Sequence, residues 1–214
     1  MKILVTAFEP FNGEAMNPAL EVVKRLPDQI LGHELVWRVL PTAFGGARTE
    51  LESVLGELEP DLVLCLGQAG GRKGLTLERV AINVMDAPIP DNAGEQPIDD
   101  PVRAEGPAAY FSTLPLKALL AGMQERGQEI RLSNTAGTFV CNQVLYEVLH
   151  WASQHRPALR AGFLHLPYLP EQVENKPGVA SLSLEQMLEG VLVLLELLVE
   201  HEGQDMKVAA GTTH

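Results

Sequence analysis

Leu62-Val63-Leu64-Cys65-Leu66 is an unbroken apolar run of strand length, bounded by turn residues. A strand with apolar side chains on both faces is typical of a parallel sheet that helices cover on both sides. Ile3 to Ala7 has the same character near the start of the chain. These two runs predict buried strands of an α/β protein.

Segments of helical period alternate with further strand-like runs. Apolar residues recur at three- and four-residue spacing in Asn17 to Leu26 and in Ala47 to Leu58. Glu34 to Val39 alternates like a strand with one wetter face, and Arg160 to Leu166 follows the same plan later. The alternation predicts a three-layer αβα sandwich around a twisted, largely parallel (mixed) sheet.

The composition is that of a globular protein with one substantial core. The chain has 214 residues, 46% of them hydrophobic and 21% charged, and domains of roughly 100–250 residues are common. We therefore expect a single α/β catalytic domain at residues 1–201 and a C-terminal tail at 202–214 that can be disordered. Sixteen Lys and Arg against 28 Asp and Glu give a net charge of −12, which argues against nucleic acid as a partner.

Neither end of the chain has a membrane signal. The first eight residues lack a basic segment, a signal core and a cleavage site, so we expect a cytoplasmic protein. The last strong helix, Ser183 to His201, is too rich in glutamate to cross a membrane. It is expected to pack against the sheet and, in an alternative reading, also to contact another subunit. Its acidic stripe consists of Glu185, Glu189, Glu196 and Glu200.

Two irregular segments stand out between the predicted elements. Met85 to Pro107 is too rich in Pro, Asp and Asn for a regular element and predicts a long ordered loop. Gly67 to Gly74 is glycine-rich but lacks the Gly-Lys-Ser/Thr ending that binds phosphate and magnesium. No cluster of His, Cys and Asp has metal-ligand spacing. We therefore expect neither a metal nor a cofactor.

The two cysteines, Cys65 and Cys141, exclude a disulfide framework and a four-thiolate zinc site. Cys141 follows a predicted strand, Glu129 to Ser133, and precedes a helical pattern that includes Val144. A thiol at a helix N-terminus feels the positive end of the helix dipole, which lowers its pKa and favours the nucleophilic thiolate. Core packing is the alternative for Cys141 and our interpretation of Cys65.

A cysteine nucleophile needs a base, and the base needs an orienting group. His165 ends an apolar strand, and the carboxyl ends of parallel strands gather functional loops, so it can meet Cys141 there. Glu78 precedes a strand-like run, Arg79 to Asn83, and is the candidate carboxylate that holds the imidazole tautomer. The alternatives are a core position for His165 and an ion pair with a nearby arginine for Glu78.

These residues stand in a series of motifs that resembles the pyroglutamyl peptidase I family, also called pyrrolidone-carboxylate peptidases. The likeness covers nearly the whole chain, and only the tail beyond about His201 lies outside it. The block that ends at Cys141 is highly specific. The motifs are Thr6-Ala7-Phe8-Glu9-Pro10-Phe11, Asn17-Pro18, Gly67-Gln68-Ala69-Gly70-Gly71-Arg72, Glu78-Arg79-Val80-Ala81-Ile82-Asn83, Ile89-Pro90-Asp91-Asn92, Thr135-Ala136-Gly137-Thr138-Phe139-Val140-Cys141-Asn142 and Gly162-Phe163-Leu164-His165.

The resemblance implies a cysteine exopeptidase that removes an N-terminal pyroglutamyl residue from peptides through a thioester. Its catalytic triad would be Glu78, Cys141 and His165. The resemblance and the apolar last helix also suggest a homo-oligomer, commonly a tetramer.

The pyroglutamyl ring is a neutral lactam, so its pocket should be apolar with a few amide-type partners and no fixed charge. Core packing is the alternative for two of the expected wall residues, Phe8 and Phe11. The backbone N–H of Cys141 is the expected oxyanion donor. By resemblance, the walls are Phe8, Phe11, Ile89, Phe139 and Val140, and the nearby polar residues are Gln68 and Asn17.

The chain departs from the family pattern at Pro88, where related sequences often carry an arginine just before Ile-Pro-Asp-Asn. A cation near the oxyanion is therefore missing from that position. Ala7 and Asn12 replace the usual glycines of the first loop, which is a smaller departure.

Two other functions remain open from the sequence. Nucleoside phosphorylases resemble this family in overall architecture, which allows a phosphorolytic glycosyl transferase, although fold likeness does not carry function. A non-catalytic binder of lactam-capped peptides would need a broken triad, and all three candidate residues are present.

Overall fold

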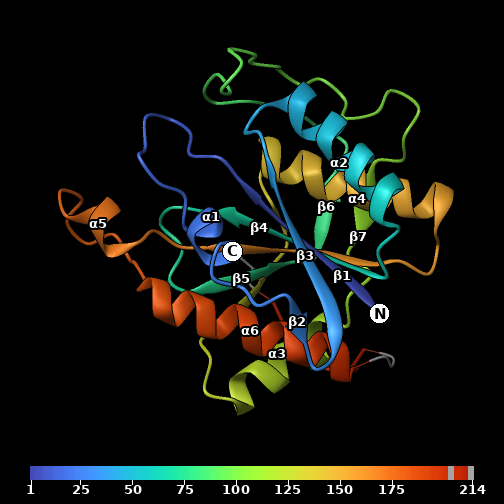
Figure 1. The fold of residues 1–214 in the computed structure, drawn as a ribbon. Coiled ribbons are helices and arrows are strands. Elements are labelled where there is room, and N and C mark those ends of the chain that lie inside the picture. Colours follow the sequence, from blue (N-terminus) through green and yellow to red (C-terminus); the bar gives the residue numbers. More distant parts are fainter. Residues whose placement is uncertain (202–204, 212–214) are drawn as a thin grey trace.

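The computed structural model describes residues 1–201 and 205–211, which form a seven-stranded sheet with helices on both faces (Figure 1). The strand order is β2-β3-β1-β4-β9-β5-β8. The predicted largely parallel, mixed sheet and αβα layering are therefore confirmed. The strands are β1 (Lys2–Phe8), β2 (Gln29–Ile30), β3 (His33–Leu40), β4 (Leu62–Gln68), β5 (Leu75–Glu78), β8 (Ile130–Ser133) and β9 (Arg160–Leu166).

Strand direction changes at two places in this sheet. β3, β1, β4 and β9 run parallel to one another, whereas β2 is antiparallel to β3 and β5 is antiparallel to β9. β8 then runs parallel to β5. β5 thus runs in the opposite direction beside β9, and its carboxyl end, Glu78, lies next to that strand.

Helices cover the two faces of the sheet as separate layers (Figure 1). α2 and α4 pack on the face that carries Leu4, Val63 and Phe163, and α1, α3 and α6 pack on the face that carries Val5 and Leu64. Every residue of β4 is buried, as its apolar sequence predicts. The helices are α1 (Pro18–Val23), α2 (Phe44–Leu58), α3 (Leu116–Glu125), α4 (Val140–His155), α5 (Pro170–Val173) and α6 (Leu184–Glu200).

Helix boundaries differ from the sequence prediction in two places. α1 ends at Val23, before the predicted Leu26: the N–H groups of Arg25 and Leu26 bond to the carbonyls three residues back, and Pro27 disfavours helical backbone at Leu26. α2 begins at Phe44, three residues before the predicted Ala47. Its start receives a capping contact from a distant loop, which local periodicity does not reveal.

The segment from Met85 to Pro107 is irregular, as predicted, and is held by specific contacts. Met85 and Asp100 form an isolated antiparallel bridge. Asp91 is buried, and its carboxylate accepts the backbone N–H groups of Phe44, Ala93 and Glu95. A separate hairpin of β6 (Val80–Ile82) and β7 (Ala109–Phe111) brackets the segment.

Three of the four glutamates in the acidic stripe of α6 form ion pairs within the chain. Glu196 and Glu200 bind Arg126, and Glu185 binds Arg25. The opposite side of α6 packs in the core below the sheet. No helix among the described residues is long and apolar enough to span a membrane.

The predicted tail includes residues 202–204 and 212–214, which lie outside the described residues. Within 205–211, the Asp205 carboxylate accepts the N–H groups of Lys117 and Ala118 at the start of α3. The Ala210 carbonyl accepts a hydrogen bond from Arg79.

Candidate active site

His165 and Glu78 form a buried hydrogen-bonded pair on neighbouring antiparallel strands. Thr76 lies opposite His165 and Glu78 lies opposite Phe163, so Glu78 is diagonal to His165 on one face of the sheet. His165 Nδ1 lies 2.7 Å from Glu78 Oε1. Because a carboxylate only accepts, Nδ1 carries the proton and Nε2 is left as an acceptor. Glu78 is the last residue of β5, and the strand-like run that the sequence predicts after it contains strand β6.

Cys141 is the second residue of α4 and faces the same end of the sheet. Its Sγ lies 2.9 Å from the point where a Cβ on Gly67 would stand. Gly67 is the register partner of His165 across β4 and β9. The missing side chain at Gly67 therefore leaves space beside His165 that the Cys141 thiol occupies.

Burial dominates the electrostatics of the Cys141 thiol. Desolvation raises its pKa to about 12, and the Glu78 carboxylate and Cys65 act in the same direction. Its own backbone N–H at the helix start and Arg72 lower the pKa, but they do not offset the burial. These effects favour the neutral thiol in the free site, whereas the helix start alone favours the thiolate.

Burial also lowers the pKa of His165, because the imidazolium form loses its hydration. Glu78 raises this pKa through its hydrogen bond and its charge, while Arg72 lowers it further. The net direction is downward. A neutral imidazole beside a neutral thiol is suited to take the thiol proton as the nucleophile attacks.

Arg72 is a fourth charged residue of the site. Its Nη1 lies 2.9 Å from Glu78 Oε1, the oxygen that also binds His165. Its Nη2 donates to the carbonyl of Thr135, at 3.1 Å, in the loop that leads into α4. The ion pair weighed as the alternative for Glu78 is present, and it coexists with the histidine contact.

Comparisons with known proteins give the same family along the whole chain. The family model described as pyroglutamyl peptidase matches residues 1–201. Pyrrolidone-carboxylate peptidase 1 of Streptococcus pneumoniae is 50% identical over 214 residues, and the match covers 100% of both chains. The pyrrolidone-carboxylate peptidase of Streptococcus suis is 52% identical over 215 residues, with 100% of both chains covered. This chain belongs to the pyroglutamyl peptidase family.

A solved structure of a pyroglutamyl peptidase shares the fold closely. Pyroglutamyl peptidase I from Bacillus amyloliquefaciens superposes with a TM-score of 0.92 at 39% identity, covering 97% of this chain and 99% of that one. The resemblance inferred from the motifs is therefore confirmed over the full length of the chain.

The aromatic residues that the pyroglutamyl peptidase pattern assigns to the pocket form two linked groups. Phe139, at the N-cap of α4, lies 6.1 Å from Phe11 and 5.3 Å from Phe44, centroid to centroid. Phe8 is buried and lies 6.4 Å from Phe163, which in turn lies 4.7 Å from His165.

The other two apolar residues assigned to the pocket are not equally accessible. Val140 is fully buried in the core beside α4, so any contact with a ligand must involve its backbone. Ile89 is half-buried and follows Pro88, which is exposed.

Both amide side chains assigned to the pocket are engaged by the protein. Asn17 Oδ1 caps α1 by accepting the Ala19 N–H, and its Nδ2 donates to the Glu9 carbonyl. Gln68 Oε1 accepts from Gln172 Nε2 at 3.0 Å. Asn17 therefore orders the first loop next to Phe11, and Gln68 ties β4 to α5.

Three positioning residues escaped the sequence reasoning. Arg72 and Asn142 stood in the quoted motifs without a role, and Gly67 stood in a turn considered only for phosphate. Asn142 accepts the Ile82 N–H and donates to the carbonyls of Ile82 and Val84, so it fixes the segment after Glu78 against α4. The available signal was that all three residues lie in the same short motifs as candidate site residues such as Gln68 and Cys141.

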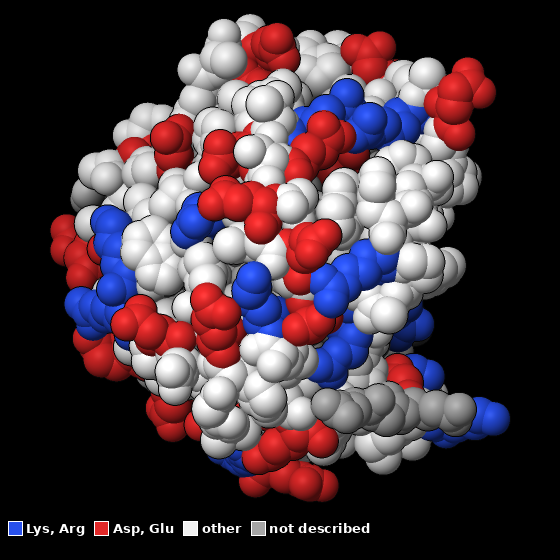
Figure 2. Space-filling view, turned by 45° about the vertical axis from the view of Figure 1, so that its right-hand side comes forward, with Lys and Arg blue, Asp and Glu red and all other residues white. Residues whose placement is uncertain are grey.

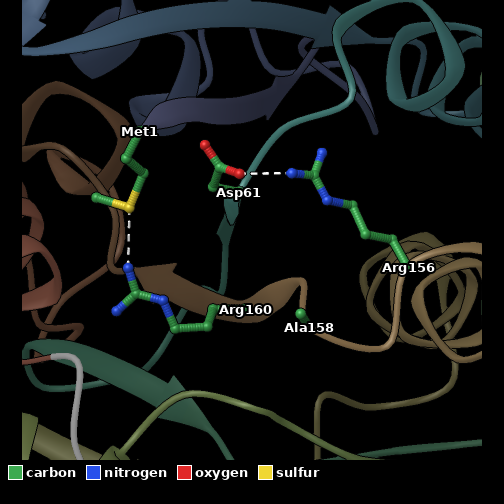
Figure 3. Close-up of a pocket in the computed structure, with 5 residues that line it drawn as sticks. All are labelled: Met1, Asp61, Arg156, Ala158 and Arg160. Carbon is green, nitrogen blue, oxygen red and sulfur yellow. Dashed lines mark hydrogen bonds and ion pairs between the residues drawn. The ribbon is translucent and has the colours of Figure 1, made fainter.

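A pocket lined by Met1, Asp61, Arg156, Ala158 and Arg160 lies away from the candidate site (Figure 3). It has a volume of about 270 Å³. Arg156 pairs with Asp61 across it, and Arg160 contacts the sulfur of Met1. Because it lies at the amino ends of β4 and β9, the seven-residue length of β4, about 20 Å, separates it from the candidate site.

The described residues offer no metal cluster, and the face drawn in Figure 2 has no continuous basic patch. No group of three or more His, Cys, Asp or Glu within the described part of the chain could hold a metal ion. On the face seen in Figure 2, Lys and Arg are interspersed with Asp and Glu.

Proposed function

We propose that this chain is a cysteine exopeptidase that removes the N-terminal pyroglutamyl residue from peptides. Cys141 is the nucleophile, His165 the general acid and base, and Glu78 the group that orients His165. The observation that carries this proposal is the buried Glu78–His165 pair beside the Gly67 gap that accommodates Cys141 Sγ. Full-length relatives named pyrrolidone-carboxylate peptidases support the substrate class.

Acylation begins with a neutral thiol and a neutral imidazole. As Sγ of Cys141 attacks the pyroglutamyl carbonyl carbon, its proton moves to His165 Nε2, and Glu78 stabilises the imidazolium through Nδ1–H. The backbone N–H of Cys141 at the start of α4 is the first donor for the oxyanion. When the tetrahedral intermediate collapses, Nε2–H protonates the leaving peptide amine and a thioester remains.

Deacylation uses the same groups in the reverse direction. His165 Nε2 takes a proton from water, the resulting hydroxide attacks the thioester carbonyl, and the proton returns to Cys141 Sγ as the thioester bond breaks. The products are pyroglutamate and the free enzyme.

The aromatic group around Phe139 suits a neutral ring better than an α-ammonium group, because a cation would lose its hydration there without a partner. Since the amides of Asn17 and Gln68 are engaged by the protein, their role in this proposal is to order the loops around the lactam. Phe8, Phe11, Ile89, Phe139 and Val140 remain the proposed apolar walls. The proposed assembly is a homotetramer, which light scattering can test. The proposed location is the cytoplasm.

Hydrolysis of a fluorogenic pyroglutamyl amide tests the function. The wild type should release the fluorophore, whereas Cys141→Ser should lose activity by about 10³-fold or more, because an alkoxide is far harder to form here than a thiolate. Circular dichroism should show both folded. Cys65→Ala, which changes the other buried thiol, is the matched control and should keep most of the turnover.

The outcomes separate the competing functions. Full activity in Cys141→Ser would exclude the thioester mechanism. A wild type that binds a pyroglutamyl peptide without cleaving it would instead support the non-catalytic binder. A prolyl amide, which lacks the lactam carbonyl and carries a charge, should be a poor substrate.

A further inference from the structure

Arg72 links three parts of the active site that come from different segments. It lies in the turn between β4 and β5, and one of its two terminal nitrogens binds Glu78 on β5. The other binds the Thr135 carbonyl, which also accepts the hydroxyl of Ser133. Ser133 lies opposite Glu78 on β8. The guanidinium thus joins the acid of the proposed triad to the loop that carries the nucleophile.

We propose that Arg72 is a positioning residue for the proposed triad, holding Glu78 Oε1 against His165 and fixing the loop that leads to Cys141. This inference rests on the proposed function, because it assigns Arg72 a part in the same reaction. Among the described residues no hydrogen bond or ion pair joins Arg72 to Cys141, so its direct contacts act through Glu78 and Thr135, and only its charge acts on Cys141 itself.

The environment of Glu78 explains why a cation is needed there. Its carboxylate is fully buried, and Oε2 has no hydrogen-bond partner among the described residues. Oε1 therefore carries both of its contacts, one from Arg72 and one from His165. A buried carboxylate with only a neutral imidazole as partner would tend to take up a proton, and a protonated acid no longer stabilises imidazolium.

The geometry requires arginine and not only a positive charge. The planar guanidinium reaches two acceptors in fixed directions, while an ammonium on a flexible stem binds as a point charge. Lysine in place of Arg72 can keep the charge near Glu78 but loses the second contact with Thr135. Substitution can therefore separate two contributions of Arg72, its charge beside Glu78 and its hydrogen bond to the Thr135 carbonyl.

Arg72 also acts on both proton-transfer groups. The groups that influence His165 are Glu78 on β5 and Arg72 in the turn. Those that influence Cys141 are Glu78, Cys65 on β4 and, again, Arg72. Arg72 lowers the pKa of His165 and of Cys141, so it favours the neutral base and the anionic nucleophile.

The experiment compares Arg72→Ala, Arg72→Lys and the matched control Lys73→Gln, an exposed charge in the same turn. Arg72→Ala should lower kcat about tenfold or more, with a smaller change in KM, because the base is misplaced and not the ring pocket. The acid limb of kcat/KM against pH should move to higher pH, because imidazolium is no longer disfavoured by the guanidinium. Arg72→Lys should restore the limb but only part of kcat. Lys73→Gln should resemble the wild type.

Alkylation of Cys141 by iodoacetamide, measured in a Cys65→Ala background, provides a readout independent of hydrolysis. Its rate should fall in Arg72→Ala, since the thiolate loses a neighbouring cation. An Arg72→Ala variant with unchanged kcat, pH profile and alkylation rate would overturn the inference. If Arg72→Ala does not fold, Arg72→Lys tests the inference instead. Wild-type kcat in Arg72→Lys would show that the hydrogen bond from Arg72 to the Thr135 carbonyl has no positioning role. A wild type that hydrolyses no pyroglutamyl amide would instead refute the proposed function.

Discussion

Gly67 leaves space on β4 for the thiol of the proposed nucleophile, in a part of the sheet that is otherwise packed with side chains. A Cβ at this position would stand 2.7 Å from the Phe163 ring and 2.9 Å from Cys141 Sγ. Phe163 is fully buried and its ring lies 4.7 Å from that of His165 at a tilt of 50°, so the ring has little freedom to move away. The site geometry therefore requires a residue without a side chain at position 67.

Gly67→Ala should reduce kcat by about tenfold or more, since small displacements of reacting groups are costly in catalysis. Overpacking should also lower the free energy of unfolding by about 1–3 kcal/mol. Turnover of the fluorogenic amide and urea denaturation measure the two effects. Gly56→Ala is the control, because Gly56 is exposed in α2 with open space around it and should gain about 0.5–1 kcal/mol. Wild-type turnover in Gly67→Ala would contradict the proposed placement of Cys141.

At the scale of elements, the start of α2 depends on a residue 47 positions away. The N-cap, Ala43, makes no side-chain hydrogen bond, and Asp91 Oδ2 accepts the Phe44 N–H at 2.8 Å instead. A carboxylate at a helix N-terminus is also favoured by the helix dipole. The Ile-Pro-Asp-Asn motif thus has a structural role: Asp91 docks the long loop, and with it Ile89, on α2.

Asp91→Ala should destabilise the fold by about 2 kcal/mol, because three backbone N–H groups lose their acceptor. KM for the pyroglutamyl amide should rise as the loop that carries Ile89 loosens. Denaturant titration and steady-state kinetics provide the two values. Asp86→Ala is a control in the same loop, since Asp86 is exposed and makes its described hydrogen bonds through the backbone. An unchanged midpoint in Asp91→Ala would show that the cap contributes nothing.

Across the whole molecule, a buried charge network joins helices to the long loop. Glu147 on α4 is almost fully buried and binds Arg48 of α2 at 2.6 Å and Arg103 of the loop at 2.8 Å. Arg103 also contacts Glu52, and Asn83 binds the backbone of Arg103 on both sides. The network connects the helical layer above the sheet with the segment that borders the proposed pocket.

Glu147→Gln should lower the free energy of unfolding by about 3 kcal/mol, because it leaves two arginines facing a neutral group in a largely buried site. Glu52→Gln removes a partner of the same Arg103 at the surface and should cost only about 0–1 kcal/mol. Thermal and urea unfolding of the two variants measure the difference. Equal losses of unfolding free energy in the two variants would mean that the burial of Glu147 does not strengthen its ion pairs.

The sequence by itself determined the architecture, the family and the identity of the candidate catalytic residues. Apolar runs such as Leu62 to Leu66 and helical periodicity act over a few residues, so they can be read without tertiary information. The motif around Cys141 led to the pyroglutamyl peptidase family, which full-length relatives confirm. The roles of Cys141, His165 and Glu78 remain a proposal that the Cys141→Ser experiment tests.

The tertiary structure decided how those residues are paired and what protonation state they favour. Glu78 and His165 are separated by 87 positions and meet because β5 inserts antiparallel beside β9, a reversal that the local pattern did not indicate. Asp91 and Gly67 also acquire their roles from partners remote in sequence, as does Arg72 through its contact with Thr135. The shift in the Cys141 pKa followed burial and not the helix start. Propensity and periodicity are local, whereas desolvation and charge pairing depend on which distant segments pack together, and only the folded chain specifies that.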